Sequence, residues 1–198
     1  MPRYATLDQL KDYMRIPRDD VMQDDRYGAT LDAASSAIRR YCGREFQEAS
    51  LTEYYDGNGA PWVYVKRPPI ITLTSVHDDP DRDYTSSSEV LSADRITYAN
   101  EGKIFRTSGG FASSQQNIKV IYIGGFTLPG GSALDASSVA LPDDVRFVCI
   151  EFAAFLATHP TGSTLKREVI GGSSVMDFYD GMIPKPLSMR LDPWVIGW

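Results

Sequence analysis

The feature that most constrains this chain is a nearly continuous apolar stretch at residues 145–157, which Arg146 and Glu151 interrupt. The stretch is too short to cross a bilayer as a helix, because that takes about 20 residues. Pro142 precedes it, and proline is favoured at the first position of a helix. We therefore predict a helix over residues 142–158 that other parts of the protein bury on most sides.

An amphipathic segment near the N-terminus can supply part of that cover. Thr6 and Gln9 have the spacing of a capping box, in which the two side chains serve each other's backbone N–H groups. Pro17 must end this helix, because the residue before a proline avoids the α conformation. The pattern predicts a helix over residues 7–15.

A second amphipathic segment has apolar residues four and three positions apart, which is typical of one helix face. These residues are Tyr27, Leu31, Ala34, Ile38 and Tyr41. Asp19 and Asp20 suit the start of a helix, and Gly43 suits a left-handed C-terminal cap. We predict a helix over residues 20–43. The shared core of the three helices should include Leu10, Leu31, Ile38, Val148, Phe152 and Phe155.

Residues 51–126 change to β-type patterns. The turn sequences at residues 56–59 and 100–102 each lie between two short strand-like segments, which predicts two hairpins. Further strands are predicted at residues 70–76 and 118–123, where β-branched residues dominate.

Together these patterns predict an α+β fold: a small helical core of about three main helices, an inserted antiparallel β-rich segment and an extended C-terminal tail. The predicted parts follow one another along the chain. They are the N-terminal helical part at residues 1–50, the β-rich insertion at 51–126, the linker and buried helix at 127–170, and the tail at 171–198.

Charge and cysteine content restrict the function. The chain has 20 Lys plus Arg and 26 Asp plus Glu, so its net charge is −6. An acidic protein is poorly suited to grip nucleic acid by neutralising phosphates, although nucleic acid could still pass it without sticking. Cys42 and Cys149 make no disulfide framework, and we expect both to be inert core residues. No signal-peptide pattern opens the sequence, so a soluble intracellular protein is expected.

The sequence offers little chemistry. His77 precedes an acid-rich turn whose carboxylates belong to Asp78, Asp79, Asp81 and Asp83. Carboxylates can bind a hard cation, but the glycine and distal glutamate of an EF-hand are missing, which favours an ordinary acidic turn. His159 precedes Pro160 at a helix end and is expected to cap carbonyl groups. No nucleophile elbow or phosphate-binding loop is present. We therefore predict no catalytic residue, no cofactor and no metal.

The C-terminal segment combines helix-breaking glycines and prolines with large apolar side chains. Free aromatic side chains of this kind are typical of protein interfaces. We predict docking onto a neighbouring chain, and expect a deletion of residues 179–198 to spare the fold. The predicted partner-binding residues are Phe178, Tyr179, Met182, Trp194 and Trp198.

Several short motifs, taken in their order along the chain, resemble one family. They lie at residues 4–11, 31–46, 66–76, 120–126, 141–145, 166–178 and 191–194. The chain resembles the head–tail connector (adaptor or neck) proteins of tailed bacteriophages.

The resemblance implies a structural virion protein that is made in the host cytoplasm and lies in the head–tail neck. It implies a ring, taken to be twelve-fold, beneath the portal protein, which extends the DNA channel and joins the head to the neck or tail. The implied partners are further copies of the chain, the portal protein and a downstream neck, stopper or tail protein. Double-stranded DNA would pass without specific binding, and no membrane or cofactor is involved. Some of Asp19, Asp20, Asp24 and Asp25 are expected to face the channel.

Two other function classes remain open. One is a metal-dependent intracellular enzyme that uses His77 and the acidic turn. The other is a β-rich ligand- or protein-binding module that uses Tyr54, Tyr55, Trp62 and Tyr64.

Overall fold

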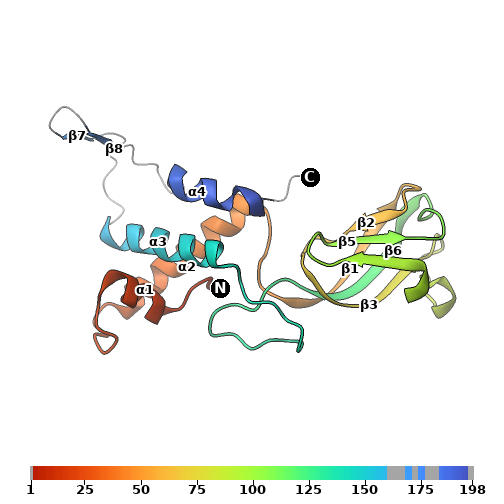
Figure 1. Cartoon of the computed structure of the whole chain (residues 1–198), viewed down its shortest axis with the longest axis horizontal. Helices are drawn as coiled ribbons and strands as arrows, with labels where there is room; N and C mark the ends of the chain where they lie inside the picture. The colour runs from red at the N-terminus through yellow and green to blue at the C-terminus, as the bar shows by residue number, and fades with distance from the viewer. Residues whose placement is uncertain (1, 160–167, 171–173, 177–182, 196–198) are drawn as a thin grey trace. The chain divides into compact units, whose positions relative to one another are not determined.

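The computed structural model of the chain describes residues 2–159, 168–170, 174–176 and 183–195 (Figure 1). The chain divides into two compact units, each considered by itself below. The helical unit comprises Met1–Arg44, Leu128–Gly130 and Leu141–Trp198, and the β unit comprises Glu45–Thr127 and Gly131–Ala140. The β unit is thus inserted between the helices, and the predicted α+β fold is confirmed.

Helix α1 (Leu7–Met14) starts as the capping box predicts. The Gln9 backbone N–H donates to Thr6 Oγ1 at 3.2 Å, and the Thr6 N–H donates to Gln9 Oε1 at 2.9 Å. The helix ends before Pro17 at Arg15, whose φ of 58° is left-handed. The sequence therefore located this helix to within a residue at its C-terminal end.

Helix α2 (Asp24–Cys42) starts four residues later than predicted and ends at Gly43, whose φ is 64°. Asp19 and Asp20 do not open it. They lie in a loop that the buried Lys11 holds from the interior of the helical unit. Lys11 Nζ donates to the carbonyl oxygens of Arg18 at 3.2 Å and Asp20 at 2.8 Å. These bonds occupy loop carbonyls in a non-helical conformation, which explains the late start.

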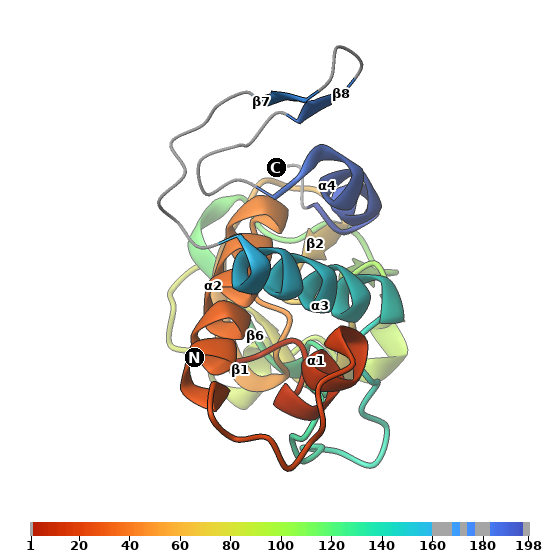
Figure 2. The same ribbon diagram turned by 90° about the vertical axis from the view of Figure 1, so that its left-hand side faces the viewer.

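Helix α3 (Asp143–Thr158) is the buried helix that the apolar stretch predicts, and it packs against α1, α2 and α4 (Figure 2). Val148 and Phe152 are buried in the core with Leu10, Leu31 and Ile38, as expected. Two aromatic side chains of α3 lie outside this core. Phe147 is 44% exposed. Phe155 is half-buried rather than buried, because it lies in the last turn of α3, where its ring stacks on the exposed His159 with the ring centres 4.5 Å apart.

A fourth helix, α4 (Lys185–Leu191), and a 3₁₀ turn, η3 (Asp192–Trp194), lie in the segment that we expected to be extended. Pro186 stands in the first turn, where its missing N–H costs nothing. Leu191 is fully buried, and the hydroxyl of Tyr41 on α2 donates to Asp192 Oδ1 at 2.5 Å. Residues 185–194 therefore belong to the helical unit, and a deletion of residues 179–198 would remove a core side chain.

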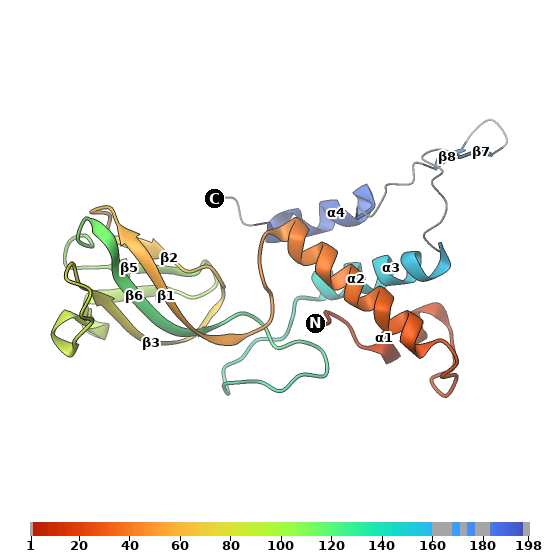
Figure 3. The ribbon, with the colours of Figure 1, turned by 180° about the vertical axis from the view of Figure 1, so that it is seen from behind.

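The β unit contains two three-stranded antiparallel sheets (Figure 3). The larger sheet has the order β1-β6-β3, and the smaller has the order β2-β5-β4. The strands are β1 (Ala49–Gly57), β2 (Trp62–Tyr64), β3 (Ile70–Asp78), β4 (Arg95–Tyr98), β5 (Lys103–Arg106) and β6 (Ser114–Gly124). Two short 3₁₀ helices, η1 (Ser86–Ser88) and η2 (Ser92–Asp94), connect β3 to β4, and a separate pair, β7 (Glu168–Ile170) and β8 (Ser174–Met176), lies in the helical unit.

Of the two predicted hairpins, one is confirmed and one is wrong. β4 and β5 pair around Gly102, whose φ of 66° suits the turn. β1 and β2 do not pair: β1 joins β6, and β2 joins β5. The central strand β6 offers β1 a long partner with alternating buried residues, whereas β2 has three residues, so the turn at residues 56–59 carries the chain from one sheet to the other.

The inner faces of both sheets contribute to one core. Val63 and Ile104 from the smaller sheet join Val76, Val120 and Tyr122 from the larger one. No helix in the described part of the chain is both long enough and apolar enough to span a membrane.

Glu48 holds the linker segment Gly131–Ala140, which is rich in small residues, in the β unit. Its buried carboxylate accepts hydrogen bonds from the Thr127 hydroxyl at 2.9 Å, the Leu134 N–H at 3.2 Å and the Ser138 hydroxyl at 2.5 Å. A buried carboxylate is stable only when donors such as these satisfy it. The linker segment is therefore an ordered part of the β unit.

Candidate interaction surfaces

Most of the predicted partner-binding residues lie outside the described residues. These are Phe178, Tyr179, Met182 and Trp198. Trp194 is described: it lies in η3 and is half-buried. The structure therefore places one member of the predicted set, beside the anchored helix α4.

The first carboxylate of the acidic turn, that of Asp78, is bound by other residues of the β unit. Asp78 Oδ2 lies 2.6 Å from Arg106 Nη1, and Asp78 Oδ1 accepts from Asn117 Nδ2 at 2.8 Å. His77 is largely buried, and its Nδ1 lies 3.2 Å from the carbonyl oxygen of Thr85. These groups have partners within the fold.

The second carboxylate shapes the turn itself. Asp79 accepts the backbone N–H groups of Asp81 at 3.0 Å and Tyr84 at 2.7 Å. Desolvation by burial raises the pKa of Asp79, but these hydrogen bonds outweigh it and hold that pKa below its ordinary value. Asp81 and Asp83 are exposed, and no three potential metal-ligating side chains gather anywhere in the described residues. The arrangement is that of an ordinary acidic turn.

Both cysteines are fully buried, as predicted. Burial raises the pKa of the Cys42 thiol to about 11 and that of the Cys149 thiol to about 11. Because the thiolate is the reactive form, the native protein should take up almost no maleimide or iodoacetamide at pH 7.5. Mass spectrometry should find two labels per chain after denaturation, and rapid labelling of the native protein would contradict the assigned core.

His159 also behaves as predicted. It ends α3, and its Nδ1 lies 3.1 Å from the carbonyl oxygen of Phe155. Capping a helix end accounts for this histidine without any catalytic role.

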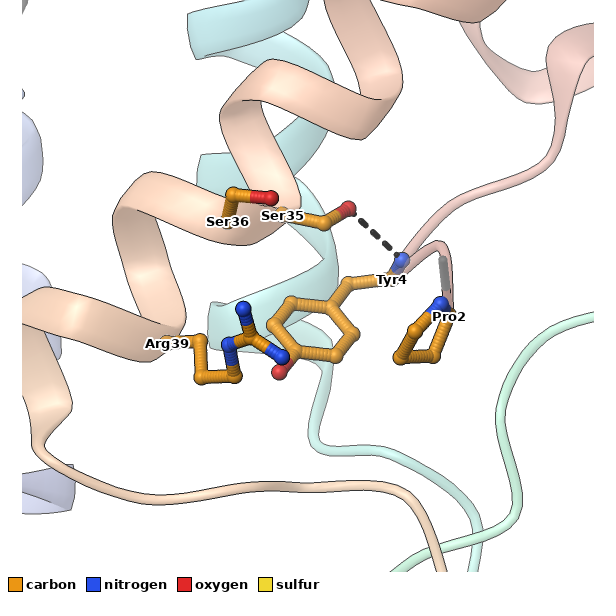
Figure 4. Close-up of a pocket in the computed structure, with 5 residues that line it drawn as sticks. All are labelled: Pro2, Tyr4, Ser35, Ser36 and Arg39. Carbon is orange, nitrogen blue, oxygen red and sulfur yellow. Dashed lines mark hydrogen bonds between the residues drawn. The ribbon is translucent and has the colours of Figure 1, made fainter.

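A small recess lies between the N-terminal segment and α2 (Figure 4). Its lining is Pro2, Tyr4, Ser35, Ser36 and Arg39. Tyr4 is buried, and its backbone N–H donates to Ser35 Oγ at 3.1 Å. This hydrogen bond fastens the N-terminal segment to α2.

The outer face of the smaller sheet is unusually apolar for an exposed surface. We call it the aromatic face; its residues are Trp62, Tyr64, Ile96, Tyr98, Lys103 and Phe105. The strand register places them in two rows, Tyr64–Lys103–Tyr98 and Trp62–Phe105–Ile96. Trp62, Tyr64 and Ile96 are each 46% exposed, and Tyr98 is 43% exposed. Contiguous apolar surface of this kind is typical of interaction sites.

Lys103 lies at the centre of this face. Its Nζ is 5.4 Å from the ring centre of Tyr98, 5.6 Å from that of Trp62 and 5.9 Å from that of Tyr64. Such cation–π contacts hold the ammonium group over the rings. The face therefore presents one positive charge within an aromatic surround.

The structure brings together two of the four aromatic residues considered for a β-rich binding module. Trp62 and Tyr64 share the aromatic face, whereas Tyr54 lies on β1 with its ring 5.4 Å from Tyr84. Tyr55 is half-buried, with its hydroxyl donating to Glu53. Tyr98 and Lys103 were not predicted as members of a surface site, although both flank the correctly predicted turn at residues 100–102. The alternation of the two strands would have placed them opposite each other.

A second apolar feature is the tip of the loop between α1 and α2. Met22 is 92% exposed and Val21 is 67% exposed. The neighbouring Asp19, Asp20 and Asp25 are exposed, as a channel-facing charge would be. Asp24 differs, because its Oδ1 lies 2.5 Å from the buried Lys11 Nζ.

A comparison with protein families identifies the class of this chain. The family model described as Head completion protein matches residues 4–158. The chain belongs to the head completion protein family. It is a structural protein and not an enzyme, and the resemblance to head–tail connector proteins is confirmed at the level of the family.

Solved structures of low sequence identity share the fold. One, in the neck of an empty GTA particle with C6 symmetry, has a TM-score of 0.56 and 16% identity, over 95% of this chain and 87% of that chain. Another, in the virion of a native gene transfer agent (GTA) particle, has a TM-score of 0.56 and 15% identity over the same shares. A third, in the neck of a native GTA particle with C12 symmetry, has a TM-score of 0.54 and 14% identity, over 95% and 86%. A search of curated proteins found no match.

Proposed function

We propose that this protein forms a ring of twelve copies in the neck of a phage-like particle. The copy number follows the GTA neck of similar fold that was computed with C12 symmetry. The ring lies beneath the portal protein, extends the DNA channel and receives a downstream neck, stopper or tail protein. The observation that carries the proposal is the family match over residues 4–158. The shared fold with chains of GTA necks supports it.

The decisive experiment is electron microscopy of assembled particles in which this chain carries a small label. We expect label density as a ring directly below the portal. Label on the capsid lattice or at the distal end of the tail would overturn the proposal.

The net charge leads to a prediction about DNA. The proposed channel must let duplex DNA slide, and cationic walls would instead bind phosphates and release counterions. With a net charge of −6, the purified protein should show no saturable binding of duplex DNA at 50 mM salt in a fluorescence anisotropy titration. The exposed Asp19, Asp20 and Asp25 are the candidates for channel-facing charge. Tight binding that weakens steeply with salt would contradict this role.

We further propose that the C-terminal apolar residues dock onto a neighbouring subunit or the portal. Because Leu191 is a core residue, point substitutions test this better than truncation. Phe178→Ser with Tyr179→Ser should leave the melting temperature unchanged and block incorporation of the chain into particles. Met189→Ser is the control, since Met189 is a 61% exposed apolar residue on α4. Normal incorporation of the double variant would show that these two residues are dispensable.

A further inference from the structure

The loop of residues 19–22 is exposed, and hydrogen bonds hold its backbone. Lys11 Nζ donates to the carbonyl oxygen of Asp20 and to that of the preceding Arg18, the Met22 N–H donates to Asp20 Oδ1 at 3.2 Å, and the Asp20 N–H donates to the Pro17 carbonyl at 3.1 Å. A buried lysine rarely supports a surface loop, because burying its charge is costly unless partners compensate it fully. The loop nevertheless presents Val21 and Met22 to solvent.

The chemistry of this loop is complementary to that of the aromatic face. The loop has an apolar tip flanked by carboxylates, and the face has aromatic rings around one ammonium group. A methionine thioether packs favourably against aromatic rings, and a carboxylate can approach Lys103 from the solvent side. Lys103 makes no ion pair with any residue in the described part of the chain, and neither does Asp19.

We propose that the loop of residues 19–22 of one copy binds the aromatic face of the next copy, with Met22 on the rings of Trp62, Tyr64 and Tyr98 and Asp19 beside Lys103. The inference rests on the proposed function, in that a ring requires contacts between copies. A ring closed by rotation needs two different, complementary patches on the same chain, and these two patches meet that need. Asp19 then serves subunit contact rather than the channel.

Preorganisation supports this pairing. Both partners are held before they meet: the loop by Lys11, and the face by the strand register of β2, β5 and β4. Little conformational entropy is therefore lost on binding, and more of the contact energy remains as affinity. Tyrosine and tryptophan are also the residues that most often dominate binding energy at interfaces.

Engineered disulfides test the contact directly. A chain carrying Met22→Cys is mixed with a chain carrying Tyr64→Cys and oxidised, and the covalent dimer is followed on a non-reducing gel. Cys42 and Cys149 are buried and contribute little background. We expect dimers to form at least tenfold faster than with the control pair Met189→Cys and Tyr64→Cys. Equal rates for the two pairs would overturn the proposal, as would preferential linkage of the Tyr64→Cys chain to a cysteine placed at Tyr179.

Charge reversal provides a second, independent test. Lys103→Glu should weaken self-association at least tenfold in analytical ultracentrifugation, and Asp19→Lys in the same chain should restore it. Lys119→Glu is the matched control, because Lys119 lies on the central strand β6 with its Nζ 5.2 Å from the ring centre of Tyr84. An equal effect of both lysine variants, or no rescue, would overturn the proposed pairing.

The same cysteine pair separates this inference from the proposed function. In assembled particles, a chain with both Met22→Cys and Tyr64→Cys should give a ladder of covalent oligomers. A labelled neck ring without the ladder refutes the contact and leaves the function standing. A ladder from purified protein, with no label in the neck, refutes the function and leaves the contact standing.

Discussion

Replacing Phe152 with alanine is expected to lower the free energy of unfolding of the helical unit by roughly 3–5 kcal/mol. Phe152 is 2% exposed in the core on α3. The loss combines the transfer free energy of the ring with the cavity that the surrounding helices leave unfilled. Urea unfolding followed by helix circular dichroism measures the effect.

Phe147 supplies a matched control for this experiment. It lies on the same helix and is 44% exposed. Phe147→Ala should change the free energy of unfolding by less than about 1 kcal/mol, as for most surface substitutions. Equal losses for the two variants would show that α3 does not present Phe152 to the core as described.

Replacing Lys11 with methionine is expected to destabilise the helical unit by about 2–4 kcal/mol. The side chain of Lys11 is 2% exposed, and its Nζ serves two loop carbonyls as well as Asp24 at 2.5 Å. Methionine retains the apolar stem but leaves these acceptors without a donor. The figure lies toward the low end for a broken buried ion pair, because the Asp24 side chain is 28% exposed and can regain water.

The exposed ion pair between Arg18 and Asp12, with a shortest N–O distance of 2.6 Å, is the comparison for Lys11. Arg18→Met should leave the melting temperature almost unchanged, since solvent screens such pairs. Amide hydrogen exchange adds a local test: Lys11→Met should accelerate exchange of the Met22 N–H and Asp20 N–H, and Arg18→Met should not. Unchanged exchange in the Lys11 variant would mean that the lysine does not hold the loop.

The location of the three main helices was predictable from the sequence, because each depends on neighbours a few residues away. The capping box at Thr6 and Gln9, the glycine cap at Gly43 and the apolar stretch of α3 act within one or two turns. The hairpin of β4 and β5 was predictable for the same reason. The start of α2 was not, since it depends on Lys11 reaching the carbonyls of a loop that follows α1.

The sequence by itself therefore determined the α+β class, the order of helical and β-rich parts and the absence of recognisable catalytic motifs. Tertiary structure decided which strands pair, since β1 finds β6 across some sixty residues and bypasses the adjacent β2. It also decided that Leu191 joins the core, and that Trp62, Tyr64 and Tyr98 surround Lys103. The physical reason is common to all three. Periodicity and capping report forces along a few residues of chain, whereas strand pairing, burial and side-chain clusters depend on free energies that exist only when distant segments meet.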